Sequence, residues 1–193
     1  MLSMLQDVSR SESGYGVVMG VAWLVTVTLI VAAVIDGWKL KVPNWLTFPM
    51  VIAGWIASGV FFGWAGLGAS LMGTAVGLGL LLPAYAIGGM GAGDVKLLAG
   101  VGAWMGAANT LWAFVVSALV GAVIAIGMVL LRRRWRHHQG MFMMILSEIM
   151  IFRSPTQLSA MAAERKGSML LLPYGIPIAI GSIAYFAWLG MLL

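Results

Sequence analysis

Long apolar stretches are the feature that most restricts how this chain can fold. Of its 193 residues, 62% are hydrophobic and 9% are charged, whereas a soluble domain carries about 25% charged residues. The apolar runs lie at residues 17–35, 45–62, 67–87, 95–131 and 170–192. A helix needs about 20 residues to cross the hydrocarbon of a bilayer. The sequence therefore predicts an all-α integral membrane protein.

The run at 95–131 is too long for a single crossing. Gly106, Ala107, Ala108 and Asn109 supply a break, which predicts two spans near 95–106 and 109–131. We therefore expect a bundle of about six transmembrane helices. These helices make a single membrane-embedded domain over residues 1–193, with a polar N-terminal tail at 1–16 and a long loop at 132–169.

The basic residues predict which way the bundle faces. With six spans, loops 36–44, 88–94 and 132–169 share one side of the membrane, and only Arg10 lies on the other. The positive-inside rule makes the basic side cytoplasmic. This side holds ten of the 11 basic residues, namely Lys39, Lys41, Lys96, Arg132, Arg133, Arg134, Arg136, Arg153, Arg165 and Lys166.

The loop at 132–169 contains a basic cluster and a short apolar segment. The cluster at 132–136 directly follows a span, so it is interpreted as an anchor to lipid headgroups, and we expect no nucleic-acid partner. Residues 141–152 are apolar but too short to cross the membrane, which favours an interfacial helix. Alternatively, residues 141–152 could form a lid over an active site or a segment that docks a partner.

Two aspartates stand at the ends of predicted spans. Asp36 ends the first apolar run, and Asp94 immediately precedes the fourth. One outward and one returning span separate them, so both must lie on the cytoplasmic side. Ionisable residues at a membrane edge are functional candidates. Gly91 and Gly93, just before Asp94, permit the close approach of another chain.

A pair of nearby carboxylates has a recognisable chemistry. Because two neighbouring carboxylates cannot both ionise easily, they share a proton. One then acts as general base towards a water molecule and the other as general acid, as in aspartic proteases. Which aspartate takes which role stays open. The sequence has no cysteine, and we expect neither a metal nor a cofactor.

A different function would use the same two residues. Asp36 and Asp94 could relay protons or cations in a small ion-coupled membrane transporter. The sequence shows no evident inverted repeat of the kind that many transporters carry. We therefore retain the transporter as the alternative to the protease.

Three segments, in order along the chain, resemble the type IV prepilin peptidases, which are intramembrane aspartic proteases. Residues 91–96, Gly-Ala-Gly-Asp-Val-Lys, resemble the family's GxGDxK signature. Asp36, followed by Val-Pro-Asn-Trp-Leu-Thr at 42–47, resembles the family's first catalytic segment. Residues 173–175 resemble the PYG motif that opens its last span. The supporting motif residues are Gly91, Gly93, Lys96, Pro43, Asn44, Pro173, Tyr174 and Gly175.

The resemblance implies a catalytic pair, a substrate and a location. It assigns catalysis to Asp36 and Asp94 and implies removal of the short leader of a prepilin, just before the substrate's apolar N-terminal helix. The implied site is the cytoplasmic face of the bacterial inner membrane. Prepilins, membrane lipids and the pilus assembly machinery are the implied partners. Which prepilin is cut, and how many copies of the chain assemble, stay open.

This chain differs in size and composition from the larger members of the type IV prepilin peptidase family. Those members carry a cytoplasmic domain with paired CxxC motifs, associated with N-methylation of the new terminus. Because this sequence lacks cysteine, we expect no methyltransferase activity. The chain is similar to the single-domain peptidases of tight-adherence (Flp-type) pilus systems, with archaeal preflagellin peptidases as the nearest competitors.

The supporting residues have structural interpretations as well. Lys96 could tune the aspartate pair or hold an acidic group of the substrate, but it is equally typical of an interfacial anchor. Pro43 and Asn44 predict the start of the second span, with Asn44 as its cap. Small residues recur every four positions in the third span, at Ala69, Gly73 and Gly77, which predicts a closely packed face.

Overall fold

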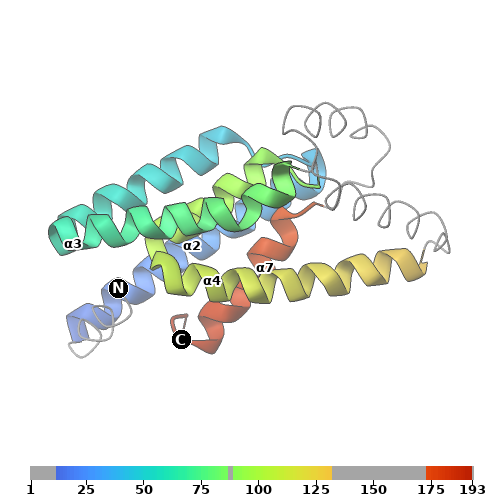
Figure 1. Cartoon of the computed structure of the whole chain (residues 1–193). Helices are drawn as coiled ribbons and strands as arrows, with labels where there is room; N and C mark the ends of the chain where they lie inside the picture. Colours follow the sequence, from blue (N-terminus) through green and yellow to red (C-terminus); the bar gives the residue numbers. More distant parts are fainter. Residues whose placement is uncertain (1–11, 87–88, 132–172, 193) are drawn as a thin grey trace.

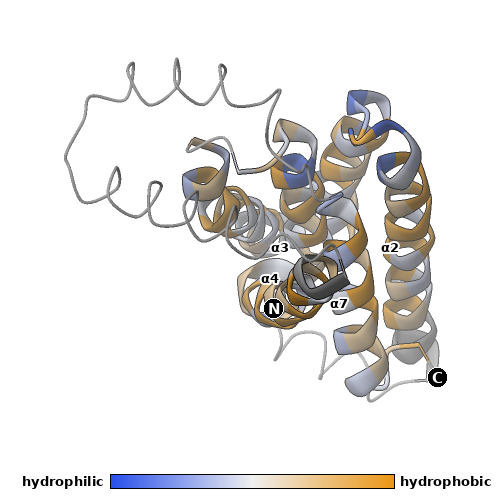
Figure 2. Cartoon of the chain, turned by 90° about the vertical axis from the view of Figure 1, so that its right-hand side faces the viewer, coloured by the Kyte–Doolittle hydropathy of each residue, from blue (hydrophilic) through white to orange (hydrophobic). Residues whose placement is uncertain are grey.

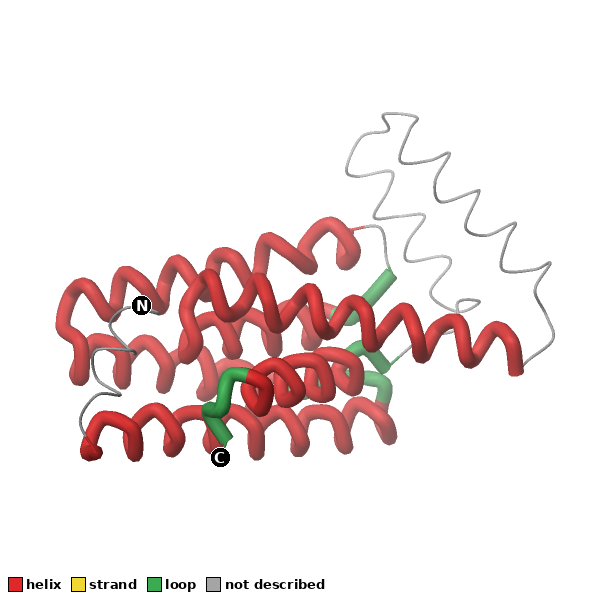
Figure 3. The backbone as a smooth tube through the Cα atoms, turned by 90° about the horizontal axis from the view of Figure 1, so that it is seen from below, coloured by secondary structure: helices red, strands yellow, loops and turns green. Residues whose placement is uncertain are grey.

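The computed structural model describes residues 12–86, 89–131 and 173–192. Within these ranges the chain forms helices joined by short loops, with no strand (Figure 3). The helices are α2 (Glu12–Lys39), α3 (Asn44–Ala86), α4 (Ala92–Leu131) and α7 (Gly175–Trp188). Stretches long and apolar enough to cross a membrane occur in three of them, at Val17–Lys39, Asn44–Ala86 and Ala92–Met128. The predicted all-α membrane bundle is confirmed.

Glycines bend the two longest helices back on themselves. Gly63 in α3 (φ 63°, ψ −153°) and Gly106 in α4 (φ 77°, ψ 171°) have non-helical backbone angles with positive φ, which glycine adopts readily because it has no Cβ. Across the bend in α3, the Trp55 indole N–H donates a hydrogen bond to the Thr74 hydroxyl (2.9 Å). The non-helical backbone at Gly106 confirms the break that the sequence predicts at 106–109. The count of six membrane crossings stays a prediction.

Two helices extend beyond the apolar runs of the sequence. The described part of α2 starts at Glu12, so residues 12–16 of the predicted polar tail are helical. Extending an existing helix by a turn is easier than starting one, because each added residue gains one hydrogen bond. The helix α4 begins at Ala92, three residues before the predicted span, so Gly93 and Asp94 lie in its first turn. The loop at 132–169, including the segment 141–152, lies outside the described residues.

The first half of α4 is the centre of the bundle. Its side chains are almost fully buried, including Leu97, Leu98 and Val101 at 0% exposure. The outward faces of the helices instead carry large apolar side chains, such as Trp23 and Trp64. Figure 2 shows hydrophobic residues along most of the helical ribbon. An apolar exterior of this kind is stable only in contact with lipid.

Glycines let α3 and α4 approach to backbone contact. A Cβ on Gly73 would collide with the carbonyl group of Gly102, and a Cβ on Gly77 would collide with that of Leu98. The Ser70 hydroxyl donates a hydrogen bond to the Ala103 carbonyl (2.6 Å) on the same face. The close packing predicted for this face of the third span is confirmed. It is the way membrane helices gain dispersion energy where lipid removes the hydrophobic driving force.

The topology gathers several helix ends at one end of the bundle. The helix α3 folds back at Gly63, so both of its ends lie at the same end of the bundle (Figure 1). The same end of the bundle holds the end of α2 and the starts of α4 and α7. The helix α7 packs against both α2 and α4. Residues from four helices therefore meet at this end.

Replacing Gly73 by alanine tests the packing of α3 on α4. The added methyl group forces the two backbones apart, and overpacking of this kind costs about 1–3 kcal/mol. Gly73→Ala should lower the free energy of unfolding in detergent by that amount. Gly79→Ala, on the same helix, meets nothing within 4 Å, so it should leave the unfolding free energy unchanged or slightly raised. Equal stability of the two variants would contradict the packing described.

Candidate functional site

Asp36 lies in the last turn of α2 with its side chain 2% exposed. Its Oδ2 accepts a hydrogen bond from the backbone N–H of Gly175 (2.8 Å), the first residue of α7. The first N–H groups of a helix have no partner within the helix, and the helix dipole favours an anion there. A Cβ on Gly175 would lie 2.9 Å from this oxygen. Glycine at 175 is therefore what lets the start of α7 reach the carboxylate.

Asp94 lies in the first turn of α4 with its side chain 5% exposed. Its Oδ2 accepts a hydrogen bond from the Gly91 N–H (3.2 Å), and its own N–H donates to the Gly91 carbonyl (3.2 Å). A carboxylate that reaches back three residues in this way is half of a capping box. The capping interaction explains why α4 starts before the apolar run does.

The second carboxylate oxygen of Asp94 is unusual. Oδ1 is buried and has no hydrogen-bond partner within the described part of the chain. A buried acceptor without a partner costs about 1–3 kcal/mol. A buried polar atom that lacks a hydrogen-bond partner destabilises the fold, and such atoms occur at sites that are kept for function.

The loop after Asp36 is packed against the backbone before Asp94. A Cβ on Gly93 would collide with the carbonyl oxygen of Val42, so glycine at 93 permits this contact. The two carboxylates are close enough for their charges to interact. The sequence prediction that Asp36 and Asp94 lie on the same side agrees with this geometry.

Tyr174, from the PYG segment, belongs to the same site. Its hydroxyl group is close enough to Asp94 for the two groups to interact electrostatically. Tyr174 and Pro173 are both partly buried and directly precede Gly175. The three residues of this segment therefore place a backbone donor against Asp36 and a hydroxyl-bearing ring near Asp94.

Lys96 is engaged with α3. Its Nζ donates a hydrogen bond to the Asn44 side-chain oxygen (2.9 Å) and lies 4.7 Å from the centroid of the Phe48 ring. The helix α3 begins at Asn44 as predicted, and the Pro43 carbonyl accepts the N–H groups of Leu46 and Thr47 (3.2 and 3.3 Å). The predicted role of Asn44 as the cap is wrong, because Asn44 is itself the first helical residue and its side-chain oxygen accepts the hydrogen bond from Lys96. The side chains of Lys96 and Asn44 thus tie the start of α4 to the start of α3.

Sequence reasoning missed how the carboxylates are held. The capping role of Asp94 had only a weak local signal, because an acidic residue stands at the third helical position but Gly91 lacks the side chain that completes a capping box. The bond between Gly175 and Asp36 joins residues 139 positions apart and had no such signal. Among the described residues, no group of three or more histidine, cysteine or acidic side chains is arranged to hold a metal ion.

Comparison with known proteins agrees with these motifs. The model of the type IV leader peptidase family matches residues 23–126, which include both aspartates. The chain belongs to this family. The resemblance seen in the sequence is thereby confirmed. The PYG segment at 173–175 lies beyond the matched residues.

The chain is also similar to two curated relatives of known name. The chain is 36% identical over 125 residues to proteins named prepilin leader peptidase/N-methyltransferase from Aeromonas salmonicida (strain A449) and from Aeromonas hydrophila. The aligned part is 61% of this chain and 42% of each relative. The chain therefore spans less than half the length of the curated relatives it matches. No solved structure matches the chain.

A double-mutant cycle tests the link between Lys96 and Asn44. If the hydrogen bond stabilises the folded chain, Lys96→Ala and Asn44→Ala should each lower the unfolding free energy, and the double variant should lose less than their sum. We expect a coupling of about 0.5–1.5 kcal/mol. As a control, Lys96→Ala combined with Asn109→Ala, a residue near the bend of α4, should lower the unfolding free energy by the sum of the two single effects. Full additivity in the first cycle would show that the link contributes nothing.

Proposed function

We propose that this chain is an intramembrane aspartic endopeptidase that removes the short leader of type IV, Flp-like prepilins. Membership of the type IV leader peptidase family supports the reaction class. The relatives named prepilin leader peptidase support the substrate class. Because the chain spans only part of those relatives, their activity and substrates are expectations for this chain.

One observation carries the proposal. Two carboxylates from different helices, Asp36 and Asp94, are buried in an apolar bundle and each accepts a hydrogen bond from a glycine N–H. Burial of an ionisable group without a cationic partner is costly. Two such groups within range of each other form the arrangement that acid–base hydrolysis needs.

The reaction follows from a proton shared between the two side chains. The ionised carboxylate takes a proton from a water molecule as the water oxygen bonds to the scissile carbonyl carbon. The protonated carboxylic acid gives its proton to the carbonyl oxygen, which produces a tetrahedral gem-diol. As the C–N bond breaks, the carboxyl that took the proton from water passes it to the leaving amine, and a hydroxyl of the gem-diol returns a proton to the other carboxylate. The pair ends with one proton again, so no other reactant is consumed. Asp94 Oδ1, which has no hydrogen-bond partner among the described residues, is available for such an exchange.

The neighbouring residues support the pair by position. We assign Gly91 and Gly175 the role of backbone donors to the carboxylates, and Gly93 that of allowing the Val42 loop to approach. Lys96, with Asn44 and the Pro43 turn, holds the starts of α3 and α4 together. Pro173 and Tyr174 orient the start of α7. These residues position the aspartates and are not proposed to react.

The proposed location is the cytoplasmic face of the bacterial inner membrane. The apolar helices and the family support an inner-membrane protein. Lys39, Lys41 and Lys96 lie on the segments that form the same end of the bundle as the aspartates. The positive-inside rule places such an end in the cytoplasm. Lipids and the pilus assembly machinery are further proposed partners.

We further propose that the chain does not methylate the new N-terminus. The curated relatives carry both activities in their name. The proposal rests on the composition of the present sequence, which contains no cysteine. Mass measurement of the mature pilin distinguishes a free amine from a methylated one, and a methylated product in a host without another methyltransferase contradicts this part.

Replacing either aspartate by asparagine tests the reaction. Asp36→Asn and Asp94→Asn keep the side-chain shape and remove the shared proton, so cleavage of a co-expressed prepilin should slow by about 100-fold or more. Candidate prepilins come from genes beside that of this chain. The mass of the processed pilin reports both the extent and the position of cleavage.

Lys96→Ala is the control for these variants. It removes a charge close to Asp94 but leaves the acid–base pair intact, so cleavage should fall much less than in either asparagine variant. Processing at the normal rate by Asp36→Asn or Asp94→Asn would refute the proposed mechanism. Ion flux through purified chain in liposomes, with no cleavage of any prepilin, would favour the transporter instead.

Gly175→Ala tests the positioning of Asp36. The methyl group would lie against the carboxylate and displace the N–H donor. A hydrogen bond to a charged group contributes about 1.5–3 kcal/mol, so kcat should fall by roughly 10- to 100-fold. Gly37→Ala is the matched control beside Asp36, because its Cβ meets only Ile176 at an ordinary 3.6 Å. Equal kcat values for the two variants would exclude this role for Gly175.

A further inference from the structure

An apolar groove with a volume of about 340 Å³ lies beside the aspartates. Four segments line it, namely the last turns of α3, the loop residue Met90 before α4, the second half of α4 and the start of α7. Apart from the Ser117 and Tyr174 hydroxyl groups, its lining side chains are apolar. A cavity of about 150 Å³ already accommodates a benzene ring. This groove therefore has room for more than one large apolar side chain.

The groove continues into the proposed catalytic site. Met90 lines it and directly precedes Gly91, the donor to Asp94. Tyr174 lines it and directly precedes Gly175, the donor to Asp36. One end of the groove is therefore built from the neighbours of both residues that hold the carboxylates.

Small residues on α4 keep the groove open. Ala118, Gly121, Ala122 and Ala125 line it at the spacing of one helix face. Ala118 and Ala122 are exposed, so the groove is accessible from outside the bundle. A Cβ on Gly121 would meet only the ring of Pro177, at 3.5 Å or more. A larger side chain at 121 would fill the groove without striking backbone.

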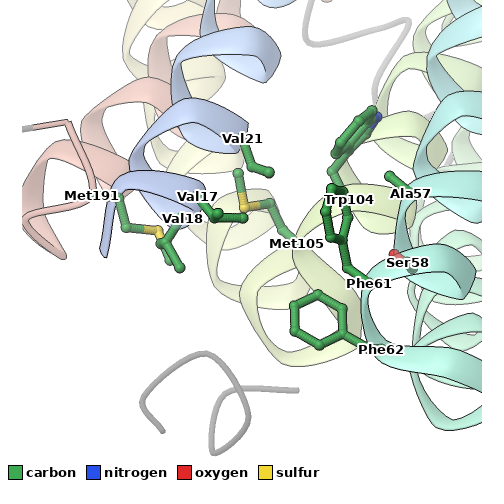
Figure 4. A pocket seen from close by; sticks show the side chains of 10 residues that line it. All are labelled: Val17, Val18, Val21, Ala57, Ser58, Phe61, Phe62, Trp104, Met105 and Met191. Carbon is green, nitrogen blue, oxygen red and sulfur yellow. The ribbon is translucent and has the colours of Figure 1, made fainter. Parts of the chain in front are cut away.

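The other cavity described in the bundle is of a different kind (Figure 4). It lies among Val17 and Val21 of α2, Phe61 and Phe62 near the bend of α3, and Met105 near the bend of α4. Its volume is about 30 Å³. It lies at the opposite end of the bundle from the aspartates, and its size is that of a packing defect.

We propose that the groove binds the apolar segment of the substrate next to the scissile bond, and that the small side chains of α4 select which side chains fit. This inference rests on the proposed function. A lipid chain could enter any groove on a membrane protein. A peptide whose apolar side chains enter this groove is also delivered to Asp36 and Asp94, because the groove ends at the segments that hold them.

Steady-state kinetics in liposomes, with the prepilin that the wild-type chain cleaves, tests the groove. Gly121→Leu fills it, so KM should rise at least tenfold while kcat changes less than twofold. Gly121→Ala should behave as wild type. Gly127→Leu is the matched control on the same helix, since a Cβ there meets nothing within 4 Å, and it should change neither constant.

A size exchange separates this effect from damage to the fold. Shortening a large apolar residue beside the scissile bond of the prepilin to alanine should restore KM for Gly121→Leu while raising it for wild type. Unchanged KM in Gly121→Leu, or a loss that no shortened prepilin restores, overturns the groove assignment. Absence of cleavage by the wild-type chain contradicts the proposed function itself.

Photo-crosslinking tests binding without catalysis. In an Asp94→Asn chain, a photoreactive residue in place of Ala118 should capture the prepilin. The same residue in place of Val123, which is 70% exposed on another face of α4, should not. Capture of lipid alone at 118 overturns the proposal, whereas capture of the prepilin supports it even where cleavage is absent.

Discussion

Backbone N–H groups at two helix starts allow a pair of carboxylates to be buried in an apolar bundle. Desolvating a carboxylate is costly unless donors compensate, and here Gly175 and Gly91 supply one donor each to Asp36 and Asp94. Because the first N–H groups of a helix are otherwise unpaired, each of these hydrogen bonds satisfies both partners. The site therefore depends on where α4 and α7 begin.

The positions of those helix starts depend in turn on glycine elsewhere. Close contact between Gly73 and Gly102 brings α3 and α4 together, and the bends at Gly63 and Gly106 return both helices towards the aspartates. The same use of small residues on the second half of α4 leaves a groove open beside the site. Small residues thus serve the packing of the helices, the proposed catalytic site and the proposed substrate groove in the same way, because each requires space that a larger side chain would fill.

The sequence predicted those parts that depend on local composition or on order along the chain. Apolar runs predicted the helices, the glycine at 106 predicted a break, and the number of spans between Asp36 and Asp94 placed them on one side. Contacts between residues far apart in the sequence could not be predicted, because no local pattern marks them. Examples are the hydrogen bonds between Gly175 and Asp36 and between Lys96 and Asn44, which only the folded structure shows. The helices α2 and α4 extend past the apolar runs because hydropathy reports contact with lipid, whereas helix ends are set by hydrogen bonds and caps.

The central claim is that Asp36 and Asp94 face each other at one end of the bundle. Since the sequence has no native cysteine, Asp36→Cys and Asp94→Cys can be combined and treated with a short bifunctional thiol reagent in native membranes. The account predicts an intramolecular crosslink in this double variant, and none when Asp36→Cys is combined with Phe61→Cys near the opposite bend. Failure of the first pair to crosslink in correctly folded chain, or crosslinking of the second pair alone, would contradict the account.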